Sequence, residues 1–210
     1  MKILNSQCYH PPKPTTSYKI GEITLKITTN QKGFSSWSFN EFKERFKITA
    51  DCYAALPKFR IPPAQTNESD IQENIDSARN EIVMLRQICP HVFQGTEFAR
   101  SLAVYEVLKE VTALYEGLLL IPQKSLSARL GNGVVDYVIE CDGVFIMVTE
   151  AKREDMDQGV AQCAIELDSA ECLNRKRKRE NNDPVPDQLY GVVTTGTTWV
   201  FLRFRWKFTT

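Results

Sequence analysis

The sequence lacks a long, uncharged apolar run. No such run approaches the roughly 20 residues that a membrane-spanning helix needs. The N-terminus also reaches the polar residues Asn5, Ser6 and Gln7 before a hydrophobic region can develop, which is unlike a secretory signal. We therefore expect a soluble, intracellular chain without a secretory signal and without a membrane partner.

The sequence also has no excess of charge of one sign. Its 26 lysines and arginines balance its 26 aspartates and glutamates, which gives a formal net charge of +0 at pH 7. No overall electrostatic field then attracts a polyanion, and a nucleic-acid surface would have to come from a local cluster of charge. Net charge therefore neither predicts nor excludes a nucleic-acid partner.

The six cysteines include no CxxC pair, and the two histidines stand outside any metal-ligand or nucleophile pattern. The cysteines are scattered through segments that are expected to form strands and helices. This distribution favours reduced, mostly buried thiols over a disulfide framework. We interpret both His10 and His91 as structural.

Prolines divide the chain into two parts. Several of them mark an irregular start, and Pro62-Pro63 breaks the chain before the next regular element. We place a boundary near residue 65, between a small N-terminal α+β appendage (1–65) and a main domain (66–210).

The appendage contains one strand pattern and one helix pattern. Ile23, Leu25 and Ile27 alternate with polar residues, which predicts a half-buried strand. Three aromatic rings then share one face of a predicted helix: Phe39, Phe42 and Phe46. We interpret this face as core, with the docking of a partner as the alternative.

The main domain opens with two helical patterns. Apolar residues at 4-3-4-3 spacing predict a helix between Ser69 and Pro90: Ile71, Ile75, Ala78, Ile82 and Leu85. A second helix starts near Thr96 and meets Gly117, and its inward side is formed by Val104, Val107, Leu108, Val111 and Leu114. We expect the second helix to pack on the core through this side.

The periodicity then changes to that of strands. Three short segments rich in β-branched or aromatic residues predict strands over 118–122, 134–140 and 144–151. Asp142-Gly143 predicts a hairpin turn between the last two. An amphipathic helix over 155–173 follows, and two more strands, separated near Gly196, end the pattern. This order of elements predicts an α/β fold.

Two carboxylates stand in these otherwise apolar strands, Asp136 and Glu150. A buried carboxylate is unfavourable unless it is paired, hydrogen-bonded or bound to a cation, so two acids at the ends of neighbouring strands suggest a shared ligand. Mg²⁺ or Mn²⁺ is the natural candidate, because carboxylates together with water and substrate phosphate complete the shell of such a cation. Lys152 leaves its strand on the same face as Glu150, where an ammonium can orient a water or stabilise developing charge.

The run VVDYVIE…VTEAKRED resembles the active-site signature of the PD-(D/E)xK nuclease superfamily. In that signature an acid on one core strand is followed, on the next strand, by an acid, one residue and a lysine. Here these residues are Asp136, Glu150, Ala151 and Lys152, and Val135 replaces the proline. The resemblance implies a restriction-endonuclease-like αβββαβ core, with a central mixed sheet flanked by helices. It also implies metal-dependent hydrolysis of phosphodiester bonds in DNA or RNA, with the Ala151 carbonyl completing the metal shell.

Three stretches, GNGVVDYVI, TEAKREDMDQGVAQ and LYGVVTTGTTWVFL, are similar to nuclease-like domains of Crinkler-type effectors from filamentous microbes. That resemblance implies that Gln158 and Gln162, at i and i+4 on the helix after the lysine, face the site. It also implies that an acid on the helix before the first strand joins the metal ligands. Glu97 is the best match for this acid, with Glu106 and Glu110 open as competitors.

Five consecutive basic residues lie near the end of the 155–173 helix: Arg175, Lys176, Arg177, Lys178 and Arg179. They predict a solvated helix end favoured by the helix dipole, a phosphate-binding patch for nucleic acid, or a signal that a nuclear-import receptor reads.

In the last strand, Arg203, Arg205 and Lys207 share one face and aromatic residues the other. Such a cationic face either holds a nucleic-acid backbone or keeps an edge strand soluble, and we favour the edge strand.

These features together predict a metal-dependent nuclease that acts as an effector, with the nucleus as one expected location. The alternative from another class is a catalytically inactive module on the same fold that binds nucleic acid or protein. A third hypothesis makes residues 1–65 a partner-docking module and the rest of the chain its scaffold.

Overall fold

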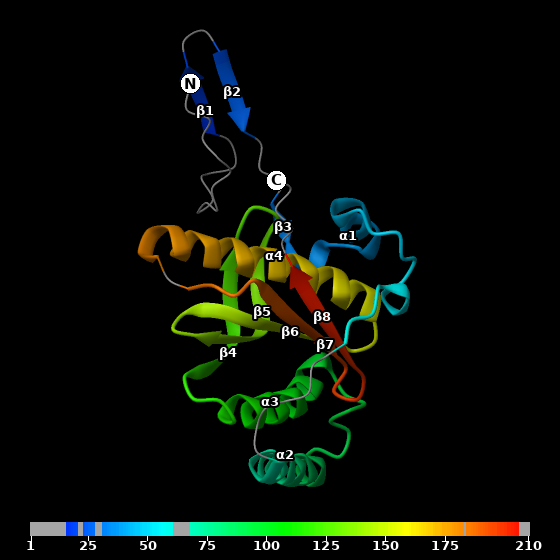
Figure 1. Ribbon diagram of the computed structural model, residues 1–210. Coiled ribbons are helices and arrows are strands. Elements are labelled where there is room, and N and C mark those ends of the chain that lie inside the picture. Colours follow the sequence, from blue (N-terminus) through cyan, green and yellow to red (C-terminus); the bar gives the residue numbers. More distant parts are fainter. Residues whose placement is uncertain (1–15, 21–22, 28–30, 61–67, 183, 206–210) are drawn as a thin grey trace.

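Six strands form one mixed β-sheet with helices on both faces (Figure 1). The computed structural model describes residues 16–20, 23–27, 31–60, 68–182 and 184–205. In chain order the elements are β1 (Thr16–Ile20), β2 (Ile23–Ile27), β3 (Lys32–Gly33), η1 (Phe34–Ser36), α1 (Phe39–Phe46), η2 (Tyr53–Ala55), α2 (Glu68–Ile88), α3 (Glu97–Ala113), β4 (Leu118–Ser127), β5 (Gly131–Cys141), β6 (Val144–Ala151), α4 (Met156–Asn181), β7 (Gln188–Thr194) and β8 (Trp199–Arg205). The predicted α/β class and the mixed sheet are confirmed, and the strand predicted at 23–27 pairs antiparallel with β1.

β5 and β6 form the central hairpin of the sheet. Asp142 and Gly143 connect them with φ angles of 49° and 75°, both positive as a tight primed turn requires. The predicted hairpin is therefore confirmed, and β6 has the bounds that the sequence predicts. β4 pairs antiparallel with β5 over a longer stretch than the predicted 118–122, because it continues to Ser127.

The strands after the hairpin place two carboxyl ends at one edge of the sheet. β6 and β7 are parallel neighbours with α4 between them in the chain, and β8 returns antiparallel to β7. Ala151, the last residue of β6, pairs with Thr194 at the end of β7. Ligand sites in such sheets gather at the carboxyl ends of the strands, and Glu150 and Lys152 lie at this edge.

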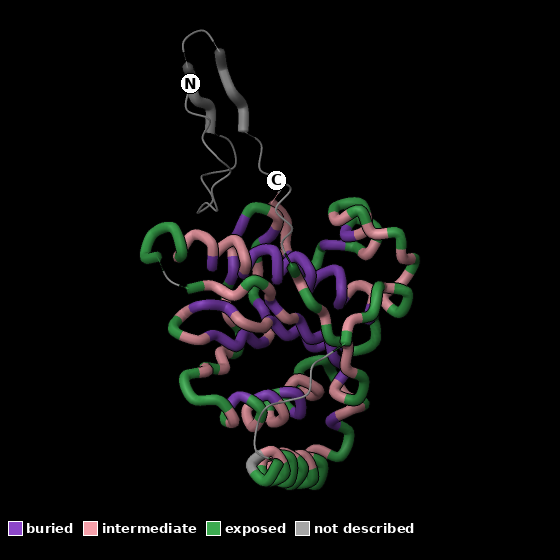
Figure 2. The backbone as a smooth tube through the Cα atoms, in the orientation of Figure 1, coloured by how far each residue is buried: buried purple, intermediate pink, exposed green. Residues whose placement is uncertain are grey.

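The helices divide between the two faces. α4 packs on β6 and β7, α3 contacts the opposite face, and α2 lies outside α3 (Figure 1). Figure 2 shows buried residues concentrated in α4 and in the central strands. None of the helices described is long and apolar enough to cross a membrane. The larger core therefore lies between α4 and the sheet.

The segment from β3 to α1 belongs to this core. β3 pairs with the start of β5, and Phe34, Trp37 and Phe42 pack in the same cluster as α4. A Cβ atom on Gly131 would come within 2.7 Å of the Phe34 ring, so this glycine is needed for the close approach. The boundary predicted near residue 65 falls outside the described residues.

One residue predicted to face the core is exposed instead, because Val111 of α3 is 43% exposed. Ile75 of α2, in the other predicted helix, is 52% exposed. α2 packs against α3 on one side, and none of its described residues is fully buried. The 4-3-4-3 spacing therefore predicts the helix correctly, and its depth of burial is set by its neighbours. α4 also continues beyond the predicted end at 173, to Asn181.

The prediction of reduced cysteines holds for four of the thiols. Cys52, Cys89, Cys141 and Cys163 are free, although only Cys163 is buried. Cys172 is disulfide-bonded, so the prediction is wrong for this residue.

Candidate active site

The Asp136 carboxylate is fixed between β4 and β6. Its Oδ2 accepts a hydrogen bond from the backbone N–H of Ala151 (2.8 Å), and its Oδ1 accepts one from Nε2 of Gln123 (3.1 Å). Gln123 lies in β4 between Pro122 and Lys124, which pair with Tyr137 and Val135, and its backbone is left-handed with φ 51°. The two contacts hold the Asp136 carboxylate beside Ala151, the last residue of β6, which follows Glu150 directly.

Glu150 and Lys152 form a buried ion pair on one face of the same strand end. Lys152 Nζ lies 2.7 Å from Glu150 Oε1, and the residues are 8% and 3% exposed. The backbone N–H of Lys152 donates to the Thr194 carbonyl (2.7 Å), which anchors the residue to β7. A Cβ atom on Gly159 would come within 2.8 Å of Lys152 Cγ, so a glycine lets α4 approach the lysine this closely.

A row of polar side chains on α4 completes the site. Gln158, Gln162 and Glu166 follow at i, i+4 and i+8, and therefore share one helix face. Gln162 Oε1 accepts hydrogen bonds from Lys152 Nζ (2.9 Å) and Gln158 Nε2 (3.2 Å), while its own Nε2 donates to Glu166 Oε1 (3.0 Å). Gln158 also donates to the Ser35 carbonyl (3.0 Å). The two glutamines predicted to face the site do contact its lysine or each other.

Glu166 is the residue that the sequence analysis missed. It is fully buried, and because neither its Oε2 atom nor that of Glu150 has a donor partner, the hydrogen bond between the two carboxyl groups requires that one of them is protonated. The signal was available, because Glu166 is the next residue in the i, i+4 row that begins with Gln158 and Gln162. The second missed residue, Gln123, carries no comparable signal, since nothing in its sequence context predicts a left-handed residue inside a strand.

The buried charges shift one another's pKa values. Burial raises the pKa of Glu150 well above its usual range, and the neighbouring Glu166 and Asp136 raise it further against the opposing effect of Lys152. Burial likewise raises the pKa of Glu166 to about 7. Burial lowers the pKa of Lys152, but the Glu150 carboxylate, with smaller contributions from Glu97 and Asp136, outweighs it, so the net shift is upward. The lysine is therefore an ammonium at neutral pH, surrounded by more acids than it can neutralise.

Among the three acids proposed for α3, Glu97 is the one that acts on the site. It is exposed at the first turn of α3, and its charge contributes to raising the pKa of Lys152. Glu106 and Glu110 instead pair with Lys109 on their own helix, at 2.6 and 3.4 Å. This electrostatic contact favours Glu97 over its two competitors.

A preassembled cage of metal ligands does not occur within the part of the chain that the structure describes. No group of three or more histidine, cysteine, aspartate or glutamate side chains there could hold a metal ion. Mg²⁺ needs fewer protein ligands, because it usually keeps several waters and binds through one or two carboxylates plus substrate phosphate. Asp136 and Glu150 fit that donor set, because the two carboxylates interact electrostatically and the buried Glu150 Oε2 atom has no donor of its own. Ala151 contributes its N–H to Asp136.

The basic run on α4 lies far from these residues. Arg177 lies about 22 Å along the helix from Gln162, fifteen residues at about 1.5 Å each. Its guanidinium donates to the Asp142 carbonyl (2.7 Å) at the β5–β6 turn, and Arg175 and Lys176 pair with Glu171 and Glu180 on α4. Lys178 and Arg179 are exposed. The structure therefore does not bring the basic run to the candidate site.

The arginines of β8 also contact the protein itself. Arg203 stacks on the Phe59 ring at 4.7 Å, and Arg205 donates to Gln188 (2.8 Å). β8 is the last strand in the described sheet order, which agrees with the predicted edge strand. Lys207, the third cation of that face, lies outside the described residues.

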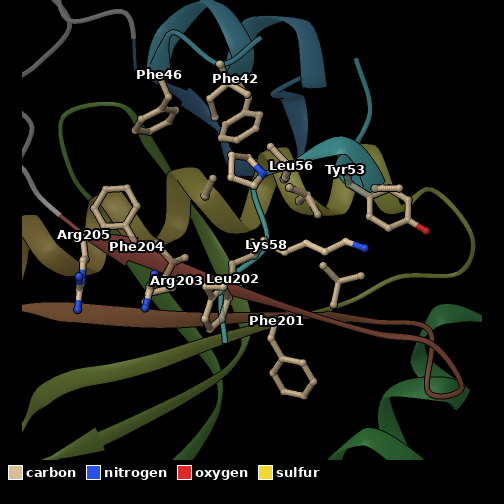
Figure 3. A pocket seen from close by; sticks show the side chains of 18 of the residues that line it. Phe42, Phe46, Tyr53, Leu56, Lys58, Phe201, Leu202, Arg203, Phe204 and Arg205 are labelled. Atoms are coloured by element: carbon tan, nitrogen blue, oxygen red, sulfur yellow. The ribbon is translucent and has the colours of Figure 1, made fainter. Parts of the chain in front are cut away.

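A separate pocket of about 780 Å³ lies between α1, η2 and β8 (Figure 3). Its walls are mainly apolar and include Phe42, Phe46, Leu56, Leu202 and Phe204, and part of α4 lines it as well. None of the acids or amides of the candidate site lines this pocket. The hydrolytic chemistry suggested by the sequence is therefore not located in it.

The comparisons with known proteins connect the chain to one group of effectors. It is 27% identical over 189 residues to Crinkler effector protein 1 of Rhizophagus irregularis, which covers 87% of the chain and 39% of that protein. It is 23% identical over 205 residues to Crinkler effector protein 5 of Phytophthora infestans, which covers 92% of the chain and 53% of that protein. No family model and no solved structure matches the chain.

The chain is thus a distant relative of Crinkler effector proteins, as the three quoted stretches predict. It spans 39% and 53% of the length of these two curated relatives. Membership of the PD-(D/E)xK superfamily stays a prediction from the Asp136, Glu150 and Lys152 pattern.

Proposed function

We propose that the chain hydrolyses phosphodiester bonds of nucleic acid at the Asp136, Glu150 and Lys152 site, with Mg²⁺ or Mn²⁺ as the cofactor. The observation that carries this proposal is the convergence of these three side chains at the carboxyl edge of β6 and β7. A purely structural ion pair needs one acid for one lysine. Here Lys152 pairs with Glu150, and the charges of Glu97 and Asp136 also act on it. Three acids around one lysine leave an excess of negative charge, which favours the binding of a cation.

The proposed cofactor would be held by Asp136 and Glu150, with Glu97 as a further ligand. A divalent cation in such a site polarises phosphate oxygens and lowers the pKa of a bound water. The Ala151 N–H and Gln123 fix the orientation of the Asp136 carboxylate, so this ligand does not have to be ordered when a cation binds.

Lys152 would act on the attacking water or on the charge that develops on the phosphate. An ammonium has three donors, and Glu150 and Gln162 accept from Lys152 in the structure. The raised pKa keeps the side chain charged at neutral pH, which suits electrostatic stabilisation of the transition state. Gln162 and Gln158 hold the amine in place from α4.

We further propose that the hydrolase acts as an effector, since both curated relatives carry that name. Exposed Lys178 and Arg179 at the end of α4 are the part of the basic run best placed to meet a nuclear-import receptor. A fluorescent fusion with both residues changed to alanine would lose nuclear accumulation if this is correct.

The experiment for hydrolysis uses labelled single- and double-stranded DNA and RNA with Mg²⁺, with Mn²⁺ and with a chelator. Lys152→Ala should slow cleavage by about 10²-fold or more, the lower end for a group that acts on proton transfer, and should leave Mn²⁺ binding in place. Asp136→Asn should weaken Mn²⁺ binding in a calorimetric titration and reduce cleavage as well. Lys43→Ala, which removes a surface lysine paired with Asp51, is the matched control and should cleave like wild type.

Absence of metal-dependent cleavage on every substrate, or equal rates for wild type and Lys152→Ala, would reject the hydrolase. Nucleic acid or protein binding without cleavage would then support the inactive-module alternative, which gel-shift titrations and pull-downs measure directly.

A further inference from the structure

Glu166 has no part in the mechanism proposed above, although it is among the most deeply buried acids that the structure describes. We propose that Glu166 is a positioning residue that determines which end of the Gln162 side-chain amide faces Lys152. The proposal rests on the function proposed for Lys152, and it concerns the side chain that holds this lysine rather than the reaction itself.

The chemistry of an amide makes this orientation important. Gln162 has one acceptor atom, Oε1, and one donor atom, Nε2. The Lys152 ammonium donates only, so it needs Oε1, which it meets at 2.9 Å. If the amide turned over, Nε2 would face the ammonium, and two donors would oppose each other in a buried site.

Glu166 supplies the contact that prevents this reversal. Its Oε1 accepts from Nε2 of Gln162 at 3.0 Å, so the donor end of the amide is held away from Lys152. Gln158 supports the same orientation, because its Nε2 donates to Oε1 of Gln162 at 3.2 Å. The acceptor end of Gln162 is thereby directed at Lys152 by two separate hydrogen bonds.

A role in packing alone does not explain an acid at this position. The adjacent α4 residues Ile165 and Leu167 are buried and apolar, and an apolar residue at 166 would avoid burying a carboxyl group there. The Glu166 carboxyl group also forms a hydrogen bond with that of Glu150, which requires that one of the two groups is protonated. Both contacts need a polar side chain at this position, and the one to Gln162 sets the orientation of that amide.

This geometry predicts opposite behaviour for two substitutions. In Glu166→Gln the new amide can accept from Gln162 through its oxygen and donate to the Glu150 carboxylate through its nitrogen, so the orientation of Gln162 is preserved. In Glu166→Leu no acceptor remains, and Gln162 is free to turn. Glu166→Met replaces the leucine variant if the latter does not fold.

The test measures how strongly the Lys152 amine is held, independently of cleavage. Purified variants are acetylated with an amine-reactive ester, and mass spectrometry gives the rate at Lys152 relative to the rate at Lys43 in the same sample. We expect Glu166→Leu to speed the labelling of Lys152 by about 2- to 10-fold, the range for loss of one ordinary hydrogen bond. Glu166→Gln should remain closer to wild type than to the leucine variant.

A double-mutant cycle with Gln162→Leu separates an action through Gln162 from a general loosening of the site. If Glu166 acts through this amide, Glu166→Leu adds no further labelling once Gln162 is leucine. Additive effects, or wild-type labelling of Lys152 in Glu166→Leu, would overturn the proposal. Equal acceleration in Glu166→Gln and Glu166→Leu would overturn it too.

The labelling result does not depend on cleavage, so the two proposals can fail separately. A protein that cuts no substrate and still shows the expected labelling pattern rejects the hydrolase and keeps the positioning role. A protein that cuts substrate while Glu166→Leu leaves labelling and the single-turnover rate unchanged keeps the hydrolase and rejects the positioning role.

Discussion

α4 and α2 are the two longest helices described, and they differ in how the rest of the molecule covers them. Every residue of α4 from Gly159 to Ala170 is buried, including polar ones. α2 contains regularly spaced apolar residues, yet none of its described residues is fully buried and Ile88 is 77% exposed. Figure 2 shows the contrast between the buried middle of α4 and the exposed outer side of α2.

The difference follows from what lies on each side of the helices. α4 lies between the sheet and the segment that contains η1, α1 and η2, so it is covered on more than one side. α2 contacts mainly α3 and faces outward on its other side. A regular apolar spacing therefore indicates a helix, but the depth of burial depends on the layers around it. Polar residues inside the fully covered helix are the ones that call for a functional explanation.

The largest expected effect is a difference in the free energy of unfolding between two matched isoleucine-to-alanine substitutions, one in α4 and one in α2. Ile165→Ala removes a fully buried side chain from α4 and should lower the free energy of unfolding by about 2–5 kcal/mol. Ile88→Ala makes the same chemical change on exposed α2 and should change it by less than about 0.5 kcal/mol. Urea denaturation of both variants measures the difference, and equal losses would contradict the assigned burial.

The second effect is the dependence of stability on pH, which Glu166 imposes from within α4. Its pKa is raised from 4.5 to about 7, so the folded chain binds this proton more tightly than the unfolded chain does. The free energy of unfolding should therefore fall as the pH rises from about 4.5 to about 7, by at most roughly 3 kcal/mol at about 1.4 kcal/mol per pKa unit. Glu150, whose pKa is also raised, acts in the same direction.

Glu166→Gln should remove part of this loss and make the stability curve flatter between pH 5 and pH 8, which are reached in buffered urea titrations. The control is Glu44→Gln, which removes an exposed carboxylate from α1. An identical slope for wild type and Glu166→Gln would mean that Glu166 does not bind this proton in the folded chain.

The sequence specified the strand-borne part of the site better than the helix-borne part. Asp142-Gly143 fixes the β5–β6 hairpin, and the period of two along β6 puts Glu150 and Lys152 on one face. Both are local rules, and both hold in the structure. Glu166 continues the i, i+4 row of Gln158 and Gln162, but its burial could not be recognised, because a polar residue on a helix is expected to face solvent until the covering layer is known.

Gln123 shows a second limit of sequence reasoning. Its contact with Asp136 depends on a left-handed backbone residue inside β4, and no local pattern requires one there. The burial of Val111 in α3 was overestimated for a related reason, because apolar spacing says nothing about which neighbours cover that side of the helix. Both the contact of Gln123 and the depth to which a helix is buried depend on how the elements pack together. Local periodicity predicts only the elements themselves.

The third prediction concerns the distance between α4 and Lys152. In Gly159→Ala the new Cβ would come within 2.7 Å of Val193 Cγ1 and 2.8 Å of Lys152 Cγ, so a neighbour has to move. We expect a loss of about 1–3 kcal/mol in the free energy of unfolding and slower cleavage, because the displaced side chain is the proposed catalytic lysine. Gly33→Ala, whose Cβ would meet only Ser36 Oγ at 3.5 Å, is the control and should be nearly neutral. Thermal melts of the two variants check this, and an unaffected Gly159→Ala would show that α4 does not press on Lys152.

The smallest effect is expected on the exposed side of α2, where a methionine is exchanged for glutamine. This exchange keeps the length of the side chain and its helix propensity nearly constant. Met84 is 57% exposed, so Met84→Gln should change the free energy of unfolding by no more than about 0.5 kcal/mol. Met156 lies at the start of α4, is 7% exposed and packs in the larger core, so the same exchange there should cost about 1–3 kcal/mol, because it buries an amide in an apolar cluster. A loss of similar size at both sites, measured in urea, would mean that α2 is covered in solution, and sedimentation at several concentrations would then show whether a second copy of the chain covers it.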